Sequence, residues 1–209
     1  MTDFEYAVFD MDGTLLTSMG YWRNSVYELY QIKDKDDEDV NYWDSLPVLK
    51  AIALANEKFN KNYSITDILT VMEPHYRNDI NFKGEAESLL YYLKGQGIKM
   101  CLITATPQPL AKKVVEMFSL ERFFSPENIY TPAEFPKGKR DPNTFIKALA
   151  NLGGVPQKSA LFEDAYYSMQ TGKSLDMKIY AVEDESQSQN KEKIKEICDY
   201  YFDSLPAKI

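Results

Sequence analysis

The chain has 209 residues, which is enough for one substantial domain or for a core domain that carries a smaller insert. Hydrophobic residues make up 44% of it and aromatic residues 13%, so the chain can bury a core and wholesale disorder is excluded. The net charge of -8 lacks the surplus of lysine and arginine that binds phosphate backbones, so we expect no nucleic-acid partner.

The N-terminal segment, MTDFEYAVFD, is acidic and has no long apolar stretch, so we expect no signal peptide. No segment of the chain is long and apolar enough to cross a bilayer. Cys101 and Cys198 are not part of a Cys-x-x-Cys motif, which favours two reduced thiols. We therefore expect a cytoplasmic protein without a membrane partner. We also expect a monomer.

The first expected element is a short buried strand over residues 4–9, which is followed by the turn-forming pair Asp12-Gly13. Residues 19–78 then show apolar and aromatic side chains at helical spacing. This pattern predicts helices over residues 21–30, 47–59 and 64–72.

Two local patterns indicate where helices of this region end or begin. The acidic run DKDDEDVN, residues 34–41, is expected to form a solvated loop between the first two helices. Ser64 and Asp67 have the spacing of a capping box, which predicts that the third helix begins at this serine.

From residue 83 onward, strand and helix patterns alternate. Strands are expected over residues 98–104, 128–131, 159–163, 177–183 and 200–205. Helices are expected over residues 85–97, 109–118, 142–153, 165–174 and 190–200. Such alternation predicts a Rossmann-like α/β core in which helices cover both faces of a parallel sheet.

We therefore expect residues 1–16 and 83–209 to form the core and residues 17–82 to form an inserted α-helical cap. The insert begins just after the carboxyl end of the first strand. Ligands of open α/β sheets bind at the carboxyl ends of the strands, so an insert at this place would cover the site as a lid.

Asp10 and Asp12 follow the first strand in the segment FDMDGTLL. Two residues apart on an extended chain, their side chains are expected on the same side, where one could attack and the other could exchange protons. The alternative is a solvated Asp-Gly turn. A calcium-binding loop is excluded, because its glycine belongs at the sixth position and here stands at the fourth, and Tyr21 stands where a glutamate is needed.

Thr104 ends the expected strand over residues 98–104, within the sequence T-A-T-P. A hydroxyl and free backbone N–H groups at this place could bind phosphoryl oxygens, and a helix N-terminus attracts anions. The alternative is a helix cap before Pro107. Thr106 is the better candidate for the cap and Thr104 the better candidate for the ligand.

Lys139 precedes a helix in the segment FPKGKRDPNTF, and its charge suits both a carboxylate and a phosphoryl oxygen. Glu163 and Asp164 end an apolar strand, where buried acids need a cation. Carboxylate oxygens are the ligands that Mg²⁺ prefers, so Mg²⁺ is the expected cofactor.

These features fit one mechanism, in which Asp10 attacks phosphorus and forms an aspartyl-phosphate. Thr104, Lys139 and backbone N–H groups would stabilise the charge on the phosphoryl oxygens. Asp12 would protonate the leaving alcohol and then activate the water that hydrolyses the intermediate. The expected function is hydrolysis of a small phosphorylated metabolite.

The chain resembles the haloacid dehalogenase superfamily, in the branch of phosphoglycolate phosphatase and β-phosphoglucomutase. The resemblance is carried by FDMDGTLL, LITAT, GKRDPNTF and LFEDAYYSMQTGKSLDMK and covers essentially the whole chain. It implies that Asp10 is the nucleophile and Asp12 the acid/base. Thr104 and Lys139 would bind phosphate, and the backbone N–H groups would be those of Gly13 and Ala105.

The same resemblance implies that Mg²⁺ is bound by Asp10, the Asp12 carbonyl and Asp164. Glu163 either binds the metal or orients its water molecules. Arg23, in the expected cap, is a further candidate for substrate binding.

Some positions depart from the family pattern. Trp22 stands where the mutase-like members carry a cap histidine, and Ser168, Thr171, Gly172 and Asp176 replace the usual glycine and alanine pairs after the acidic motif. The alternatives to a phosphatase are a β-phosphoglucomutase-like phosphomutase, which Trp22 disfavours, and a phospho-accepting or binding module without turnover. The two acids of the first motif, two residues apart, and the long insert disfavour a phospho-accepting receiver.

Overall fold

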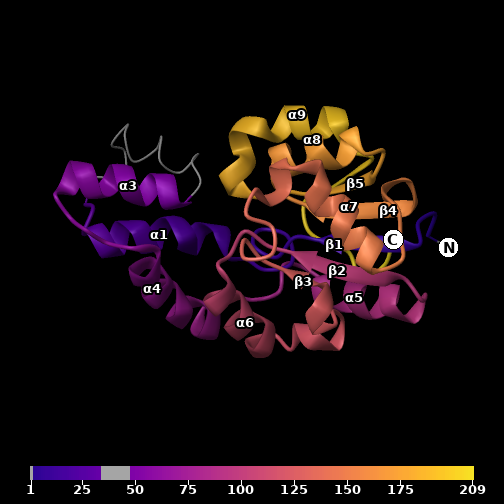
Figure 1. Cartoon of the computed structure of the whole chain (residues 1–209), viewed down its shortest axis with the longest axis horizontal. Helices are drawn as coiled ribbons and strands as arrows, with labels where there is room; N and C mark the ends of the chain where they lie inside the picture. Colours follow the sequence, from indigo (N-terminus) through magenta and orange to yellow (C-terminus); the bar gives the residue numbers. More distant parts are fainter. Residues whose placement is uncertain (1, 34–47) are drawn as a thin grey trace. The chain divides into compact units, whose positions relative to one another are not determined.

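The computed structural model describes residues 2–33 and 48–209, and the chain divides into two compact units. The first unit contains Met1–Thr17 and Asn81–Ile209, and the second contains Ser18–Ile80 (Figure 1). The acidic run over residues 34–41, expected to form a loop, lies outside the described residues. In the described part of the chain, every helix is too short or too polar to cross a membrane.

The first unit is built on a six-stranded sheet in the order β3-β2-β1-β4-β5-β6, and every neighbouring pair is parallel. The strands are β1 (Tyr6–Phe9), β2 (Lys99–Ile103), β3 (Ile129–Tyr130), β4 (Ser159–Glu163), β5 (Lys178–Val182) and β6 (Tyr200–Phe202). The expected α/β fold with a parallel sheet is therefore confirmed.

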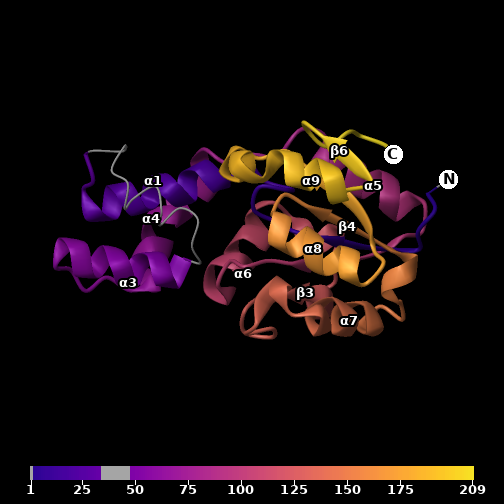
Figure 2. The same cartoon turned by 90° about the horizontal axis from the view of Figure 1, so that it is seen from above.

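Helices cover both faces of this sheet, as Figures 1 and 2 show. The helices α7 (Pro142–Asn151), α8 (Tyr166–Ser174) and α9 (Lys191–Ile197) lie on one face, and α5 (Ala86–Gly95) and α6 (Gln108–Met117) lie on the other. Short 3-10 helices are η1 (Leu120–Arg122), η2 (Pro126–Asn128), η3 (Gly138–Arg140), η4 (Pro156–Lys158) and η5 (Glu185–Asn190). The expected last helix is shorter than its pattern mainly at its C-terminal end, because Cys198 has an extended backbone and β6 begins at Tyr200.

Alternate residues of the strands supply the two cores, because successive side chains of a strand point to opposite faces. On one face, Val8, Cys101, Leu161 and Ile179 pack with buried residues of α7, α8 and α9. On the other, Phe162 stacks on Phe9 with ring centroids 4.3 Å apart. The central strands are thus buried on both faces, which holds the loops at their carboxyl ends in place.

The second unit contains α1 (Met19–Tyr30), α3 (Val48–Phe59) and α4 (Ile65–Asn78). The helix α4 begins after Ser64, whose backbone N–H donates to the Asp67 carboxylate at 2.7 Å, so the predicted cap is confirmed. The indole N–H of Trp22 donates to the Tyr76 hydroxyl within this unit at 3.2 Å.

Candidate active site

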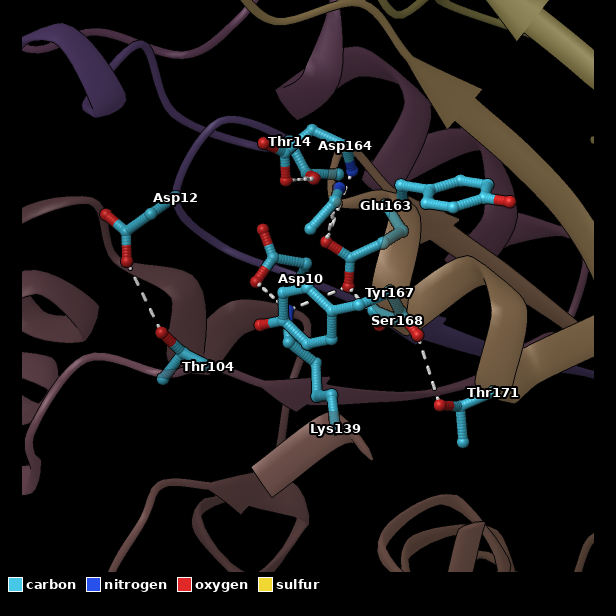
Figure 3. A network of polar contacts seen from close by, with 12 residues as sticks. Asp10, Asp12, Thr14, Thr104, Lys139, Glu163, Asp164, Tyr167, Ser168 and Thr171 are labelled. Atoms are coloured by element: carbon cyan, nitrogen blue, oxygen red, sulfur yellow. Dashed lines mark hydrogen bonds and ion pairs between the residues drawn. The ribbon is translucent and has the colours of Figure 1, made fainter. Parts of the chain in front are cut away.

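Polar side chains from four segments meet at the carboxyl ends of the central strands (Figure 3). Asp10 follows β1, Thr104 follows β2, and Lys139 lies in η3. Glu163 is the last residue of β4, and Asp164 follows it. The strand order places β1 between β2 and β4, so residues far apart in sequence become neighbours.

Lys139 is the cation at the centre of this group. Its side chain is 5% exposed, and its Nζ atom donates to Asp10 Oδ1 at 2.6 Å and to Glu163 Oε2 at 2.7 Å. Burial alone lowers the pKa of a lysine, but the charges of Asp10 and Glu163 raise the pKa of Lys139 well above its ordinary value. Lys139 therefore stays charged and neutralises part of the acidic cluster.

Glu163 has both carboxylate oxygens occupied by hydrogen-bond donors. Oε1 accepts from the backbone N–H groups of Asp164 at 3.2 Å and Ala165 at 3.1 Å. Oε2 accepts from Lys139 and from the Ser168 hydroxyl, the latter at 2.7 Å. These contacts hold the carboxylate in one orientation and compete with direct binding to a metal.

Asp10 and Asp164 have carboxylate oxygens with fewer partners. Asp10 Oδ2 is buried and has no hydrogen-bond partner among the described residues, while Asp164 Oδ1 accepts from Thr14 at 3.3 Å. Burial and, next to it, the negative charge of Glu163 raise the pKa of Asp10 to about 7. The same two causes raise the pKa of Asp164 well above its ordinary value. This is the electrostatic situation that a bound cation relieves.

The carboxylates of Asp10, Glu163 and Asp164 each offer an oxygen atom within 4.8 Å of the others. An oxygen-only set with an unpartnered buried atom fits a hard divalent cation such as Mg²⁺. Three of the residues expected to bind metal, Asp10, Glu163 and Asp164, therefore lie together, and Asp10 and Asp164 have the oxygens with the fewest partners.

Asp12 makes contacts of its own, to two threonines. Its Oδ2 atom accepts from the Thr106 hydroxyl at 2.6 Å and from the Thr104 hydroxyl at 3.3 Å. Figure 3 shows the Asp12 carboxylate turned toward Thr104. Asp10 thus pairs with Lys139, while Asp12 binds the hydroxyls of these two threonines.

The expectation that Thr106 caps the following helix is wrong. The helix α6 begins at Gln108, and Pro107 occupies the N-cap position. Thr106 instead donates from its backbone N–H to Thr104 Oγ1 at 3.0 Å and from its hydroxyl to Asp12.

The two backbone donors expected for phosphate differ from each other. Gly13 has a φ of 88°, and its N–H donates to the Leu16 carbonyl at 2.9 Å, so this donor already has a partner. Ala105 is exposed, and its N–H makes no hydrogen bond within the described residues. Arg23 lies on α1 in the second unit and stays a prediction as a substrate ligand.

Several residues near the site make hydrogen bonds that the sequence did not predict. Ser168 and Thr14 donate to Glu163 and Asp164, and Lys83 Nζ donates to the Gly13 carbonyl at 2.6 Å and to Asp184 at 2.8 Å. A position on the first turn of a helix that follows an acidic strand end could have indicated Ser168. Lys83 had no such signal, because its partner lies 101 residues away.

Tyr167 is another neighbour of Lys139 that no sequence pattern indicated. Burial raises the pKa of its hydroxyl, which Lys139 partly offsets. The guanidinium of Arg140 stacks on its ring, 4.1 Å from the centroid. Figure 3 shows the Tyr167 ring beside Lys139, on the side of the site where Asp10 lies.

Known proteins resemble this chain over most of its length. The family model described as haloacid dehalogenase-like hydrolase matches residues 4–176. A phosphorylated carbohydrates phosphatase of Thermotoga maritima is 32% identical over 94 residues, which span 44% of this chain and 43% of that protein. A phosphoglycolate phosphatase of Aquifex aeolicus is 23% identical over 79% of this chain and 78% of its own length.

The fold has solved counterparts as well. The crystal structure of a HAD hydrolase, family IA, variant 3, from Entamoeba histolytica superposes with a TM-score of 0.78 at 19% identity. The superposition covers 96% of this chain and 93% of that one. At this identity the likeness concerns the fold.

Proposed function

Because the chain belongs to the haloacid dehalogenase-like hydrolase family, we propose that it is a Mg²⁺-dependent phosphatase of small phosphorylated metabolites, with Asp10 as its nucleophile. The observation that carries this proposal is the pairing of Asp10 with Lys139 at 2.6 Å beside Glu163 and Asp164. Lys139 neutralises Oδ1 of Asp10, and Oδ2 has no hydrogen bond to a described residue.

In the first half-reaction an oxygen of Asp10 forms a bond to phosphorus, and the ester bond to the leaving alcohol breaks. Asp12 donates the proton that the departing alcohol oxygen requires. Lys139, Thr104 and the free N–H of Ala105 are the donors available to the phosphoryl oxygens. The products of this step are the free alcohol and the aspartyl-phosphate.

In the second half-reaction Asp12 takes a proton from water while the water oxygen attacks phosphorus. The bond between phosphorus and the Asp10 oxygen breaks, which releases inorganic phosphate and restores the carboxylate. Asp10, Asp164 and the Asp12 carbonyl would hold the Mg²⁺ ion, which supplies positive charge against the phosphate. Glu163 accepts four hydrogen bonds on its two oxygens, so it would hold Lys139 in place beside the metal ligands without binding the metal itself.

A phosphomutase would use the same aspartyl-phosphate but must protect it from water until a sugar hydroxyl arrives. Trp22 cannot abstract a proton, because an indole N–H only donates, and here it donates to Tyr76. This supports hydrolysis over phosphoryl transfer within a sugar phosphate. We propose that the second unit, from about residue 17 to 82, is the helical cap that selects the substrate.

The nucleophile is tested by the substitution Asp10→Asn. An amide neither attacks phosphorus nor binds Mg²⁺ well, so release of phosphate from an aryl phosphate should fall at least about a thousandfold. The measurement is phosphate release by purified, folded protein with Mg²⁺ present. A variant that keeps more than a few per cent of the wild-type rate would contradict the assignment of Asp10.

A further inference from the structure

The hydroxyl of Thr106 makes a short hydrogen bond to Asp12. Thr106 is 3% exposed, and its Oγ1 atom lies 2.6 Å from Asp12 Oδ2. Thr104 reaches the same oxygen at 3.3 Å and accepts the backbone N–H of Thr106 at 3.0 Å. The two threonines and the aspartate thus form one connected group at the carboxyl ends of β1 and β2.

Thr104 and Thr106 differ in what else they can do. Each hydroxyl has a single proton to donate. If Thr104 donates its proton to a phosphoryl oxygen, it no longer donates to Asp12. Thr106 still donates to the Asp12 carboxylate, and it is anchored for this by burial and by the bond from its backbone N–H to Thr104.

The orientation of Asp12 matters because a proton moves only along a well-aligned hydrogen bond. An aspartate side chain turns about two bonds, and a charge-assisted hydrogen bond to a buried hydroxyl restricts that rotation. The second carboxylate oxygen then points in a defined direction.

We propose that Thr106 is a positioning residue, which orients the Asp12 carboxylate for proton transfer to the leaving alcohol and from the attacking water. The proposal rests on the acid/base function proposed for Asp12. In this proposal Thr104 binds the phosphoryl group, and Thr106 orients Asp12, the acid/base.

The test compares Thr106→Val with Thr106→Ser across phosphate monoesters whose leaving groups differ in basicity. Valine keeps the shape and removes the hydroxyl, and serine restores it. The quantity measured is kcat/KM, which reports the steps up to departure of the alcohol. Loss of the hydrogen bond that aligns Asp12 should lower kcat/KM about tenfold or more for alkyl phosphates, which need protonation.

For 2,4-dinitrophenyl phosphate, whose leaving group needs no proton, the loss in Thr106→Val should stay below about twofold. Thr106→Ser should recover most of the rate on alkyl esters. Thr131→Val is the matched control, since Thr131 is 5% exposed and its hydroxyl donates to Glu134 at 2.7 Å. This substitution removes a hydrogen bond of the same kind away from Asp12, so kcat/KM should stay unchanged for both classes of ester.

Equal losses on both classes of ester, an unchanged Thr106→Val variant or a serine variant without recovery would each overturn the proposal. Asp12→Asn is measured on the same esters to separate the two claims. A selective loss on alkyl esters in Asp12→Asn supports the acid/base assignment independently of Thr106. A uniform loss there would overturn that assignment, and the positioning function with it.

Discussion

At the residue scale, the site holds three buried carboxylates against one buried lysine. Lys139 reaches Asp10 and Glu163, while Asp164 accepts a longer hydrogen bond, 3.3 Å, from the Thr14 hydroxyl. Burying such a set is costly unless further positive charge arrives. A divalent cation would supply that charge at the atoms with the fewest partners.

The difference between Glu163 and Asp164 predicts their order of importance for Mg²⁺. We expect Asp164→Asn to raise the Mg²⁺ concentration for half-maximal activity by about a hundredfold or more, and Glu163→Gln by about tenfold, because outer partners matter less than ligands. Activity is titrated with Mg²⁺ after chelator treatment. Glu183→Gln is the control, since this acid pairs with Lys191 away from the cluster. The reverse order would make Glu163 the direct ligand.

At the element scale, α8 carries residues of the site and fixes them by close packing on the sheet. Its first turn contributes Tyr167 and Ser168, and its later residues approach β4 and β5 through Gly172. A Cβ atom on this glycine would lie 2.6 Å from Leu161 Cδ2 and 3.0 Å from Ile179 Cδ1. Both neighbours are fully buried, so neither can move away without cost.

This close approach predicts that Gly172→Ala destabilises the protein by about 1–3 kcal/mol through overpacking, despite the better helix propensity of alanine. The free energy of unfolding is measured by urea denaturation. Gly95→Ala in α5 is the matched control, because nothing lies within 4 Å of its added Cβ. That variant should be neutral or more stable. A Gly172→Ala protein as stable as wild type would contradict the packing argument.

At the scale of the whole molecule, the chain leaves the first unit and returns to it at adjacent residues. The Thr17 N–H donates to the Asn81 carbonyl at 3.0 Å, and the Asn81 N–H donates to the Thr17 hydroxyl at 3.1 Å. The first unit also has its own sheet and its own buried core. It therefore has what an independent folding unit requires.

We expect a protein in which residues 18–80 are replaced by a two-glycine turn to fold on its own. The paired backbones of Thr17 and Asn81 have the spacing that a short hairpin turn bridges. The measurement is a cooperative thermal transition followed by circular dichroism. Loss of the transition would show that the first unit depends on the insert. The expectation that the full chain is a monomer stays a prediction, which analytical ultracentrifugation would test.

The order of strands and helices was predictable from the sequence, because hydrophobic periodicity and turn residues act over a few neighbours. The same local patterns showed that Asp10, Thr104 and Glu163 stand at strand ends. In a parallel sheet the carboxyl ends of the strands meet at one edge, so the proximity of these residues follows from the predicted strands alone.

Only the tertiary structure decided which atoms contact each other. Lys139 binds Asp10 across 129 residues of sequence, and Thr106 binds Asp12 across 94. The Gly13 N–H, expected for phosphate, donates to Leu16 instead. Such pairings depend on strand order, side-chain rotation and competition among nearby donors, which are properties of the packed chain and leave no periodic signal in the sequence.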